Sequence, residues 1–195
     1  MNHPSSKGSP GCEYLGVWFV AVLKLLFPRP PRPPLTRMRS SCGSTSSKST
    51  SPVSAFFATV PSGTSRIGWY AFYGCESLSS VTIPDSVTAI GSYAFTVCTG
   101  LKNITIPDSV SSITQADFSG CTSLTSITIP DGVTSIGDYA FSDCTRLKSI
   151  SIPDSVTSIG SRAFYNCTSL TSITIPDSVT SIGDYAFYEC TRLTS

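Results

Sequence analysis

The chain has very little of what enzyme active sites are built from. His3 is its only histidine, so neither a Ser-His-Asp triad nor a Cys-His pair can be assembled from the rest of the sequence. The sequence also lacks a glycine-rich phosphate-binding loop. We therefore interpret it as a protein without enzymatic activity and without a cofactor.

Charged side chains are scarce and unevenly placed. Lys, Arg, Asp and Glu make up 13% of the residues, which is low for a soluble domain. Residues 1–54 carry seven basic residues against Glu13 alone, and residues 55–195 carry six basic and eleven acidic residues, so their net charges are +6 and −5. The mildly acidic larger part gives no electrostatic reason to expect nucleic-acid binding.

The cysteines lack the spacing of a metal site. Zinc sites typically pair cysteines about two to four residues apart, whereas six of the eight here recur every 23 residues. We expect these six to be buried, free thiols that act as small apolar residues. Disulfides between neighbouring repeats are the alternative. The six are Cys75, Cys98, Cys121, Cys144, Cys167 and Cys190.

No apolar run is long enough to cross a bilayer. The longest, residues 14–27, has 14 residues, against roughly 20 for a transmembrane helix. Three interpretations fit it: a secretory or anchoring signal, a tail that is disordered or associates with a membrane interface, or non-native sequence ahead of the true repeats. The Pro/Arg string 28–34 favours polyproline II and fits an SH3-type groove, and the Ser/Thr tract to Ser54 indicates a disordered linker.

What the sequence has in abundance is repetition. Five full repeats of 23 residues begin at Leu78, Leu101, Leu124, Leu147 and Leu170. One partial copy precedes them and one truncated copy follows. A fixed period in this range is typical of a solenoid, in which each repeat is one coil stacked on the last. We therefore divide the chain into an N-terminal tail, 1–54, and a repeat solenoid, 55–195, and expect it to be a fragment of a longer array.

The repeat 124–146 shows what each coil should look like. Residues 126–129 alternate polar and apolar, which predicts a short strand with one buried face. Pro130-Asp131-Gly132 predicts a turn, and 133–136 a second short extended segment. Ala140 and Cys144 lie four residues apart, which predicts one helical turn. The expected inward residues are Leu124, Ile127, Ile129, Val133, Ile136, Ala140, Phe141 and Cys144.

The recurring pattern Leu-x-x-Ile-x-Ile-Pro-x-x-Val-x-x-Ile-Gly-x-x-Ala-Phe-x-x-Cys resembles the BspA-like class of leucine-rich repeat. The resemblance covers residues from about 55 to 195. It implies a curved, mainly β leucine-rich-repeat solenoid. Proteins of this class are often found at the cell surface, where they bind other proteins or take part in adhesion. The class brings no catalytic residues with it.

The repeat 101–123 departs from this pattern. Thr114 stands at the glycine position, and Asp117 stands at the position of the inward alanine. Because a lone buried carboxylate is costly, we expect Ala116 to turn inward locally and Asp117 to reach solvent.

The outward strand positions are the candidate ligand-binding surface. Stacking places them on one continuous face that is small, hydroxylated and uncharged. No Trp, Tyr or Arg interrupts this face, which argues against tight protein binding by the face alone. A regular Ser/Thr array also suits glycans, and a merely solvated face is the alternative. The candidates are Ser80, Thr82, Asn103, Thr105, Ser126, Thr128, Ser149, Ser151, Ser172 and Thr174.

Three other sets of residues receive structural interpretations. One aspartate follows each Ile-Pro, and we interpret these as turn residues, because calcium needs about six to eight oxygen ligands. Tyr93, Tyr139 and Tyr185 are expected to be half-buried packing residues. Asn103 and Asn166 begin glycosylation sequons. The aspartates are Asp85, Asp108, Asp131, Asp154 and Asp177.

These observations predict a non-enzymatic recognition or adhesion module that binds a protein or a surface glycan through its strand face, at the cell surface or after secretion. The first rival is a cytoplasmic interaction scaffold that uses the Pro-rich tail. The second is a fragment of a longer repeat protein with no specific ligand. The sequence leaves the ligand and the oligomeric state open.

Overall fold

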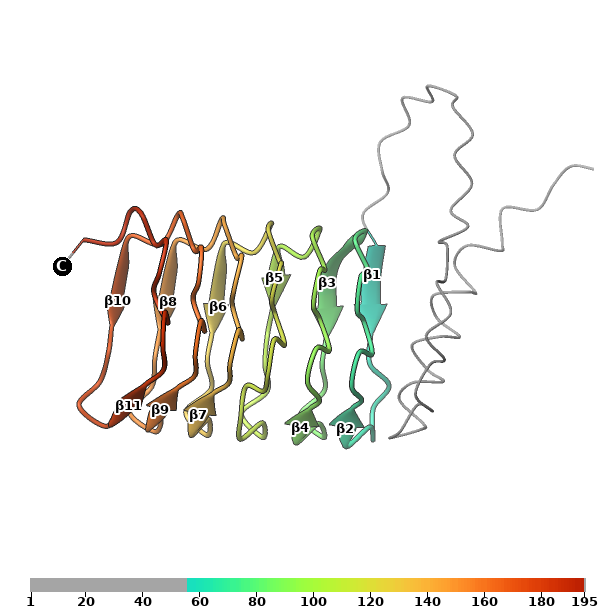
Figure 1. Cartoon of the computed structure of the whole chain (residues 1–195). Helices are drawn as coiled ribbons and strands as arrows, with labels where there is room; N and C mark the ends of the chain where they lie inside the picture. Colours follow the sequence, from blue (N-terminus) through green and yellow to red (C-terminus); the bar gives the residue numbers. More distant parts are fainter. Residues whose placement is uncertain (1–55, 195) are drawn as a thin grey trace, which may run out of the picture.

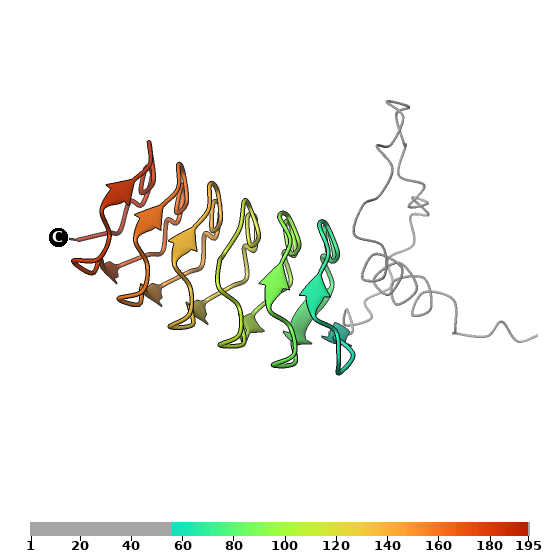
Figure 2. The same ribbon diagram turned by 90° about the horizontal axis from the view of Figure 1, so that it is seen from below.

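The computed structural model describes residues 56–194, which form one elongated stack of coils (Figure 1). Viewed from below, the coils follow one another as similar loops along a single axis (Figure 2). The interpretations of residues 14–27, 28–34 and the linker to Ser54 lie outside the described residues. Coils 1 to 6 comprise residues 56–77, 78–100, 101–123, 124–146, 147–169 and 170–192.

A ladder of parallel strands covers one side of the stack. One sheet contains β1 (Phe56–Thr59), β3 (Leu78–Thr82) and β5 (Asn103–Ile104), and another contains β6 (Ser126–Thr128), β8 (Ser149–Ser151) and β10 (Ser172–Thr174). Within each sheet, paired residues lie 23 positions apart, as Ile127 and Ile150 do, except that Phe56 pairs with Leu78. The alternation of polar and apolar residues therefore formed the expected strand, with its isoleucine buried and its hydroxyls exposed.

A second ladder confirms the second extended segment. Its two-residue strands are β2 (Arg66–Ile67) and β4 (Ala89–Ile90) in one sheet, and β7 (Ser135–Ile136), β9 (Ser158–Ile159) and β11 (Ser181–Ile182) in another. In coils 1 to 5 the isoleucine of this segment is buried, as Ile136 is at 1% exposure. The coils are therefore hydrogen-bonded to one another through two separate strand ladders.

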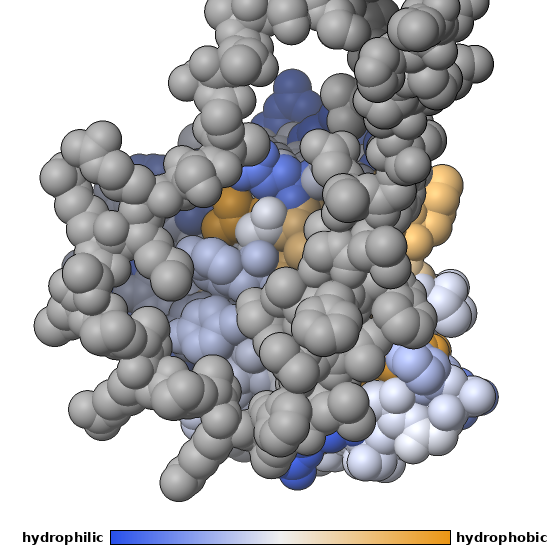
Figure 3. Space-filling model, turned by 90° about the vertical axis from the view of Figure 1, so that its right-hand side faces the viewer, coloured by the Kyte–Doolittle hydropathy of each residue, from blue (hydrophilic) through white to orange (hydrophobic). Residues whose placement is uncertain are grey.

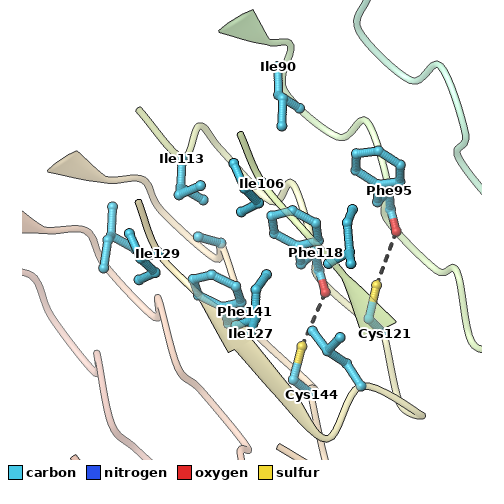
Figure 4. Packing of buried hydrophobic residues seen from close by; sticks show 14 of the residues in the cluster. Ile90, Phe95, Ile106, Ile113, Phe118, Cys121, Ile127, Ile129, Phe141 and Cys144 are labelled. Carbon is cyan, nitrogen blue, oxygen red and sulfur yellow. Dashed lines mark hydrogen bonds between the residues drawn. The ribbon is translucent and has the colours of Figure 1, made fainter. Parts of the chain in front are cut away.

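Columns of identical side chains fill the space between the ladders (Figure 4). The phenylalanines stack face to face, with ring centroids 5.1–5.5 Å apart and ring planes within 10°. Such pairs contribute roughly 0.5–1.5 kcal/mol each beyond their buried area. The column comprises Phe72, Phe95, Phe118, Phe141, Phe164 and Phe187.

The helical turn expected before each cysteine is not found within residues 56–194, which contain strands and turns only. In this corner of the coil, backbone N–H groups alternate between two kinds of acceptor. Cys144 N–H donates within its coil to the Phe141 carbonyl, at 3.2 Å, but Phe141 N–H donates to Ala163 of the next coil, at 2.7 Å. An α-helix needs every N–H for its own segment, so the stacking bonds replace the helix.

Each corner also contains two residues in the left-handed region, where side chains other than glycine are strained. The first position holds Tyr70, Tyr93, Ala116, Tyr139, Arg162 and Tyr185, with φ of 54–64°. The second holds Gly74, Val97, Gly120, Asp143, Asn166 and Glu189, with φ of 56–72°. Val97 is the most strained of these, because its side chain branches at Cβ.

The expectation that Asp117 reaches solvent is wrong. Its side chain is 0% exposed, and Ala116 is buried as well. The carboxylate accepts the Thr114 backbone N–H at 2.6 Å and the Thr114 hydroxyl at 3.0 and 3.1 Å. Two donors of Thr114, together with the Ala94 backbone, therefore offset part of the cost of burying this carboxylate.

The hydrogen bond between Thr114 and Asp117 replaces one that a glycine makes in other coils. In coil 4, Gly137 N–H donates to the carbonyl of Ile113 in the preceding coil, at 2.9 Å. A Cβ at Gly137 would lie 2.7 Å from the carbonyl carbon of Thr114, so this close approach needs glycine. Thr114 has a Cβ, and its N–H donates to Asp117 instead. Its hydroxyl lies 3.4 Å from the Ile90 carbonyl, which is the corresponding acceptor in coil 2.

Coil 3 is consequently the irregular coil of the stack. Between coils 3 and 4, each ladder is reduced to one isolated β-bridge, Thr105 to Thr128 in the first and Ile113 to Ile136 in the second. Desolvation raises the pKa of Asp117 to about 7, although the hydrogen bonds from Thr114 oppose the shift.

The strain at Val97 gives a stability prediction. Replacing Val97 with Asn, the residue that coil 5 has at this position, should raise the free energy of unfolding by about 1 kcal/mol, because Asn tolerates the left-handed region. Urea denaturation followed by circular dichroism measures the change. The opposite change is Gly120→Val, at the same position of coil 3. It should lower stability by a similar amount through backbone strain alone, because the added Cβ would make only ordinary contacts at 3.5 Å or more. Equal stability of all three chains would contradict the strain.

Asp117 gives a prediction about pH. Its folded-state pKa of about 7 exceeds the ordinary 3.8, so the ionised carboxylate destabilises the fold. This cost is absent below about pH 4, grows as the pH rises toward 7 and is constant above that. The double variant Thr114→Gly/Asp117→Ala should therefore gain stability over the natural chain across this range, by an amount on the order of a few kcal/mol.

The measurement is the free energy of unfolding of both chains at several pH values between 4 and 8. The single variant Asp117→Ala is the control. It should be less stable than the double variant, because the Thr114 N–H loses its acceptor. A stability difference that does not change with pH would show that Asp117 is not the titrating group.

Candidate functional site

All ten predicted strand residues lie on one side of the stack, in two columns. The first column runs through Ser80, Asn103, Ser126, Ser149 and Ser172, and the second through Thr82, Thr105, Thr128, Ser151 and Thr174. Nine of them are exposed, and Ser80 is half-buried. We call these ten residues the hydroxyl face.

The β ladder holds the hydroxyl face rigid. Ser126, Ser149 and Ser172 occupy matching positions on three hydrogen-bonded strands, as do Thr128, Ser151 and Thr174. Between the columns, Ile127 and Ile150 point inward and are 6% exposed. Adjacent hydroxyls therefore repeat at the strand spacing, about 4.8 Å. The face presents donors and acceptors in a fixed array that costs little further ordering on binding.

Coil 1 extends this face with two residues that the sequence analysis did not single out. Phe57 pairs with Ser80, and Thr59 pairs with Thr82. Phe57 is 70% exposed and adds an apolar group at the end of the first column. Counting back 23 residues from Ser80 and Thr82 would have found both. Seen from the β1 end, hydrophobic and hydrophilic patches lie next to each other on the described surface (Figure 3).

Charged residues border the hydroxyl face without entering it. Lys102 and Lys148 are exposed one residue before the first column. The five turn aspartates, at positions 85, 108, 131, 154 and 177, are exposed beyond the second column. Within residues 56–194, no three His, Cys, Asp or Glu side chains are grouped so that they could hold a metal ion.

The two sequons differ in their surroundings. Asn103 is exposed on β5, within the hydroxyl face, so a glycan there would cover part of that face. The Asn166 side chain is half-buried, and its amide donates to Asp143 Oδ1 at 2.8 Å. A search of the described residues for helices long and apolar enough to span a membrane finds none.

Four of the six repeat cysteines are buried as expected, whereas Cys75 and Cys190, in the first and last coils, are half-buried. Five of the six thiols make a regular set of contacts. Each donates its S–H to the carbonyl of the phenylalanine 26 residues earlier, at 3.0–3.3 Å. Figure 4 shows two of these bonds, from Cys121 and Cys144. Burial raises the pKa of Cys121 to about 12 and that of Cys144 well above the ordinary value. Cys121 and Cys144 therefore link neighbouring coils as neutral thiols. The five donors are Cys98, Cys121, Cys144, Cys167 and Cys190.

Strand ladders, a Leu/Ile/Phe/Cys core and one 23-residue repeat per coil together define a leucine-rich-repeat solenoid. The family model of the "BspA type Leucine rich repeat region" matches residues 55–144 and 118–195. The chain belongs to this BspA-type leucine-rich-repeat family.

Solved structures agree with this assignment. A T. pallidum leucine-rich repeat protein is 32% identical over 71% of this chain and 78% of its own, with a TM-score of 0.64. A leucine-rich cell surface protein from Faecalibacterium prausnitzii is 39% identical over 71% of this chain and 46% of its own, with a TM-score of 0.56. A leucine-rich repeat protein from Bacteroides ovatus is 36% identical over 70% of this chain and 44% of its own, with a TM-score of 0.54.

The chain thus spans less than half the length of the Faecalibacterium and Bacteroides proteins. No match was found among curated protein sequences.

The thiol column gives a chemical prediction. Because thiolates are the reactive form, Cys98, Cys121, Cys144 and Cys167 should not react with Ellman's reagent at pH 8 in the folded chain. At most four of the eight cysteines should be titrated without denaturant, and all eight in guanidinium chloride. A fifth fast-reacting thiol would contradict the buried column. Fewer than eight thiols after unfolding would show that disulfides form.

Proposed function

We propose that this chain is a non-enzymatic recognition module that binds a protein or a surface glycan through its hydroxyl face. The observation that carries the proposal is the pair of exposed, in-register columns on a rigid ladder. A ligand that meets this array replaces many water-exposed hydrogen bonds at once. No single residue dominates, so affinity comes from the number of contacts.

The chemistry of the face favours polar, repetitive ligands. Its ten residues carry no charge, and the lysines and aspartates at its borders are placed to meet charged groups on the ligand only at the margins. Polysaccharides and extended polypeptides both present hydrogen-bonding groups at short, regular intervals, which suits contacts repeated every 4.8 Å or so. One similar protein is described as a leucine-rich cell surface protein, which supports a place for this module at the cell surface or outside the cell.

The test blocks the centre of the hydroxyl face. Ser126→Arg/Ser149→Arg places two like charges on neighbouring positions of β6 and β8, where both side chains are exposed. Binding of the full chain to a glycan array and to a panel of cell-surface proteins should fall at least tenfold for every target, because the arginines cover the array sterically.

The matched control carries the same two charges elsewhere. Ser111 and Thr134 are exposed on neighbouring coils, ahead of the second ladder. Ser111→Arg/Thr134→Arg should leave binding within about twofold of the natural chain. If the face variant bound as well as this control, the hydroxyl face would not be the binding site.

A further inference from the structure

The corners of coils 4 to 6 form a second exposed surface of different chemistry. Tyr139, Arg162 and Tyr185 follow one another in the first left-handed position, and Tyr165 and Tyr188 lie three residues after it in coils 5 and 6. The expectation of half-buried tyrosines holds for Tyr93 and Tyr139 but is wrong for Tyr185, which is 59% exposed, and Tyr188 is 51% exposed. Tyrosine and arginine are the residue types that most often dominate protein interfaces. We call these five residues the tyrosine ridge.

Arg162 shows that the tyrosine rings of this ridge bind a guanidinium group. Its guanidinium carbon lies 5.5 Å from the ring centroid of Tyr139 and 5.4 Å from that of Tyr185. The guanidinium also donates a hydrogen bond to the Tyr139 hydroxyl. A planar cation is thus layered between two tyrosines, one coil away on each side. This geometry combines cation–π attraction to two rings with a hydrogen bond to one of their hydroxyls, and the planar guanidinium suits such a site better than an ammonium group does.

Other rings of the ridge are arranged to take a further planar group. Tyr165 and Tyr188 stack with centroids 5.7 Å apart and planes 12° apart. Tyr185 and Tyr188 meet edge to face at 5.7 Å and 82°. Tyr185 and Tyr188 are therefore the two rings that remain exposed along the corner, while Tyr165 is half-buried.

Carboxylates surround these rings. The corner segments 137–146, 160–169 and 183–192 contain four acidic residues against Arg146, Arg162 and Arg192, which gives a net charge of −1. The negative charge of Glu189 raises the pKa of the nearby Tyr165 hydroxyl. The corners of coils 1 to 3 are different, because Glu76 is their one exposed charged residue. The acidic residues are Asp138, Asp143, Asp184 and Glu189.

We propose that the tyrosine ridge is a second interaction surface, which binds an arginine-bearing segment of a partner protein by stacking guanidinium groups on its tyrosines. Asp184 and Glu189, both exposed, pair with the charge of the bound arginines. Charge complementarity favours a cationic partner, and the layered Arg162 favours arginine over lysine. The ridge lies at the corner of the coil, apart from the hydroxyl face, so the two binding activities are separable.

The test titrates the full chain with a fluorescent peptide of four Arg-Gly repeats and reads fluorescence polarisation. Peptides of the same length with lysine or citrulline in place of arginine are the controls. The arginine peptide should bind at least tenfold more tightly than the lysine peptide, and the neutral citrulline peptide should not bind. Equal binding of the arginine and lysine peptides would overturn the proposal, as would the absence of binding by the arginine peptide.

Variants separate the ridge from general electrostatics. Asp184→Lys/Glu189→Lys should weaken arginine-peptide binding at least tenfold. The turn variant Asp108→Lys/Asp131→Lys, with the same change in net charge, should weaken it less than twofold. Tyr188→Ser keeps the charge and should weaken it about fivefold. Equal effects of the two charge-reversal pairs would overturn the proposal. So would tighter binding of a neutral oligosaccharide at the ridge.

A last variant identifies the source of the arginine. The chain itself carries Arg29, Arg32, Arg37 and Arg39. Replacing these four with glycine should leave the affinity for the arginine peptide within about twofold. A tenfold or greater gain would mean that the chain's own segment occupies the ridge, and would overturn the assignment to a partner protein.

Discussion

Every coil depends on backbone hydrogen bonds to its neighbours, because its own segment supplies too few. In the corner, three N–H groups per coil donate forward, as those of coil 4 do to Ser161, Ala163 and Tyr165. In the second segment the direction reverses, and Thr157 N–H donates back to the Thr134 carbonyl at 3.0 Å. Bonds running both ways across each junction fix its register. A coil shifted by one residue would leave buried donors unpaired on both sides, at about 1–3 kcal/mol each.

The fixed register explains why side chains are arranged in columns. A residue lies beside its own equivalent in the next coil, so Phe stacks on Phe with nearly parallel rings. The same register brings each cysteine S–H to a phenylalanine carbonyl of the preceding coil. Stability therefore accumulates junction by junction. It is lowest where a junction loses bonds, as on both sides of coil 3.

The strands and the hydroxyl face could be predicted because the evidence lies within one repeat. Alternation identifies the inward isoleucines, and the 23-residue period then places every outward hydroxyl beside the next. The corner could not be predicted this way. Ala140 and Cys144 have a spacing that suits a helix, but the acceptor that excludes the helix, the Ala163 carbonyl, belongs to another coil.

Asp117 shows the same limit on a smaller scale. Taken alone, an aspartate at position 117 suggests a side chain exposed to solvent, and Thr114 suggests only that the glycine of the other repeats is missing. The structure joins the two, since Thr114 loses its backbone acceptor and Asp117 supplies another. Pairs of departures three residues apart can be recognised only when the hydrogen bond that the regular coil makes there is known. The two substitutions are one exchange of partners.

The coils also differ from one another in an informative way. Strand columns on the hydroxyl face stay nearly uniform, and the first corner column changes from Tyr70 and Tyr93 through Ala116 to Tyr139, Arg162 and Tyr185. Most members of both sets are at least partly exposed, so core packing leaves their identity free. A uniform face suits a ligand that repeats along the stack. The corner side chains differ from coil to coil, so this surface has no repeat and suits a short segment that binds at one place. Ala116 divides that corner into the neutral Tyr70–Tyr93 stack, with rings 4.9 Å apart, and the tyrosine ridge. One framework therefore supports two surfaces with different kinds of selectivity.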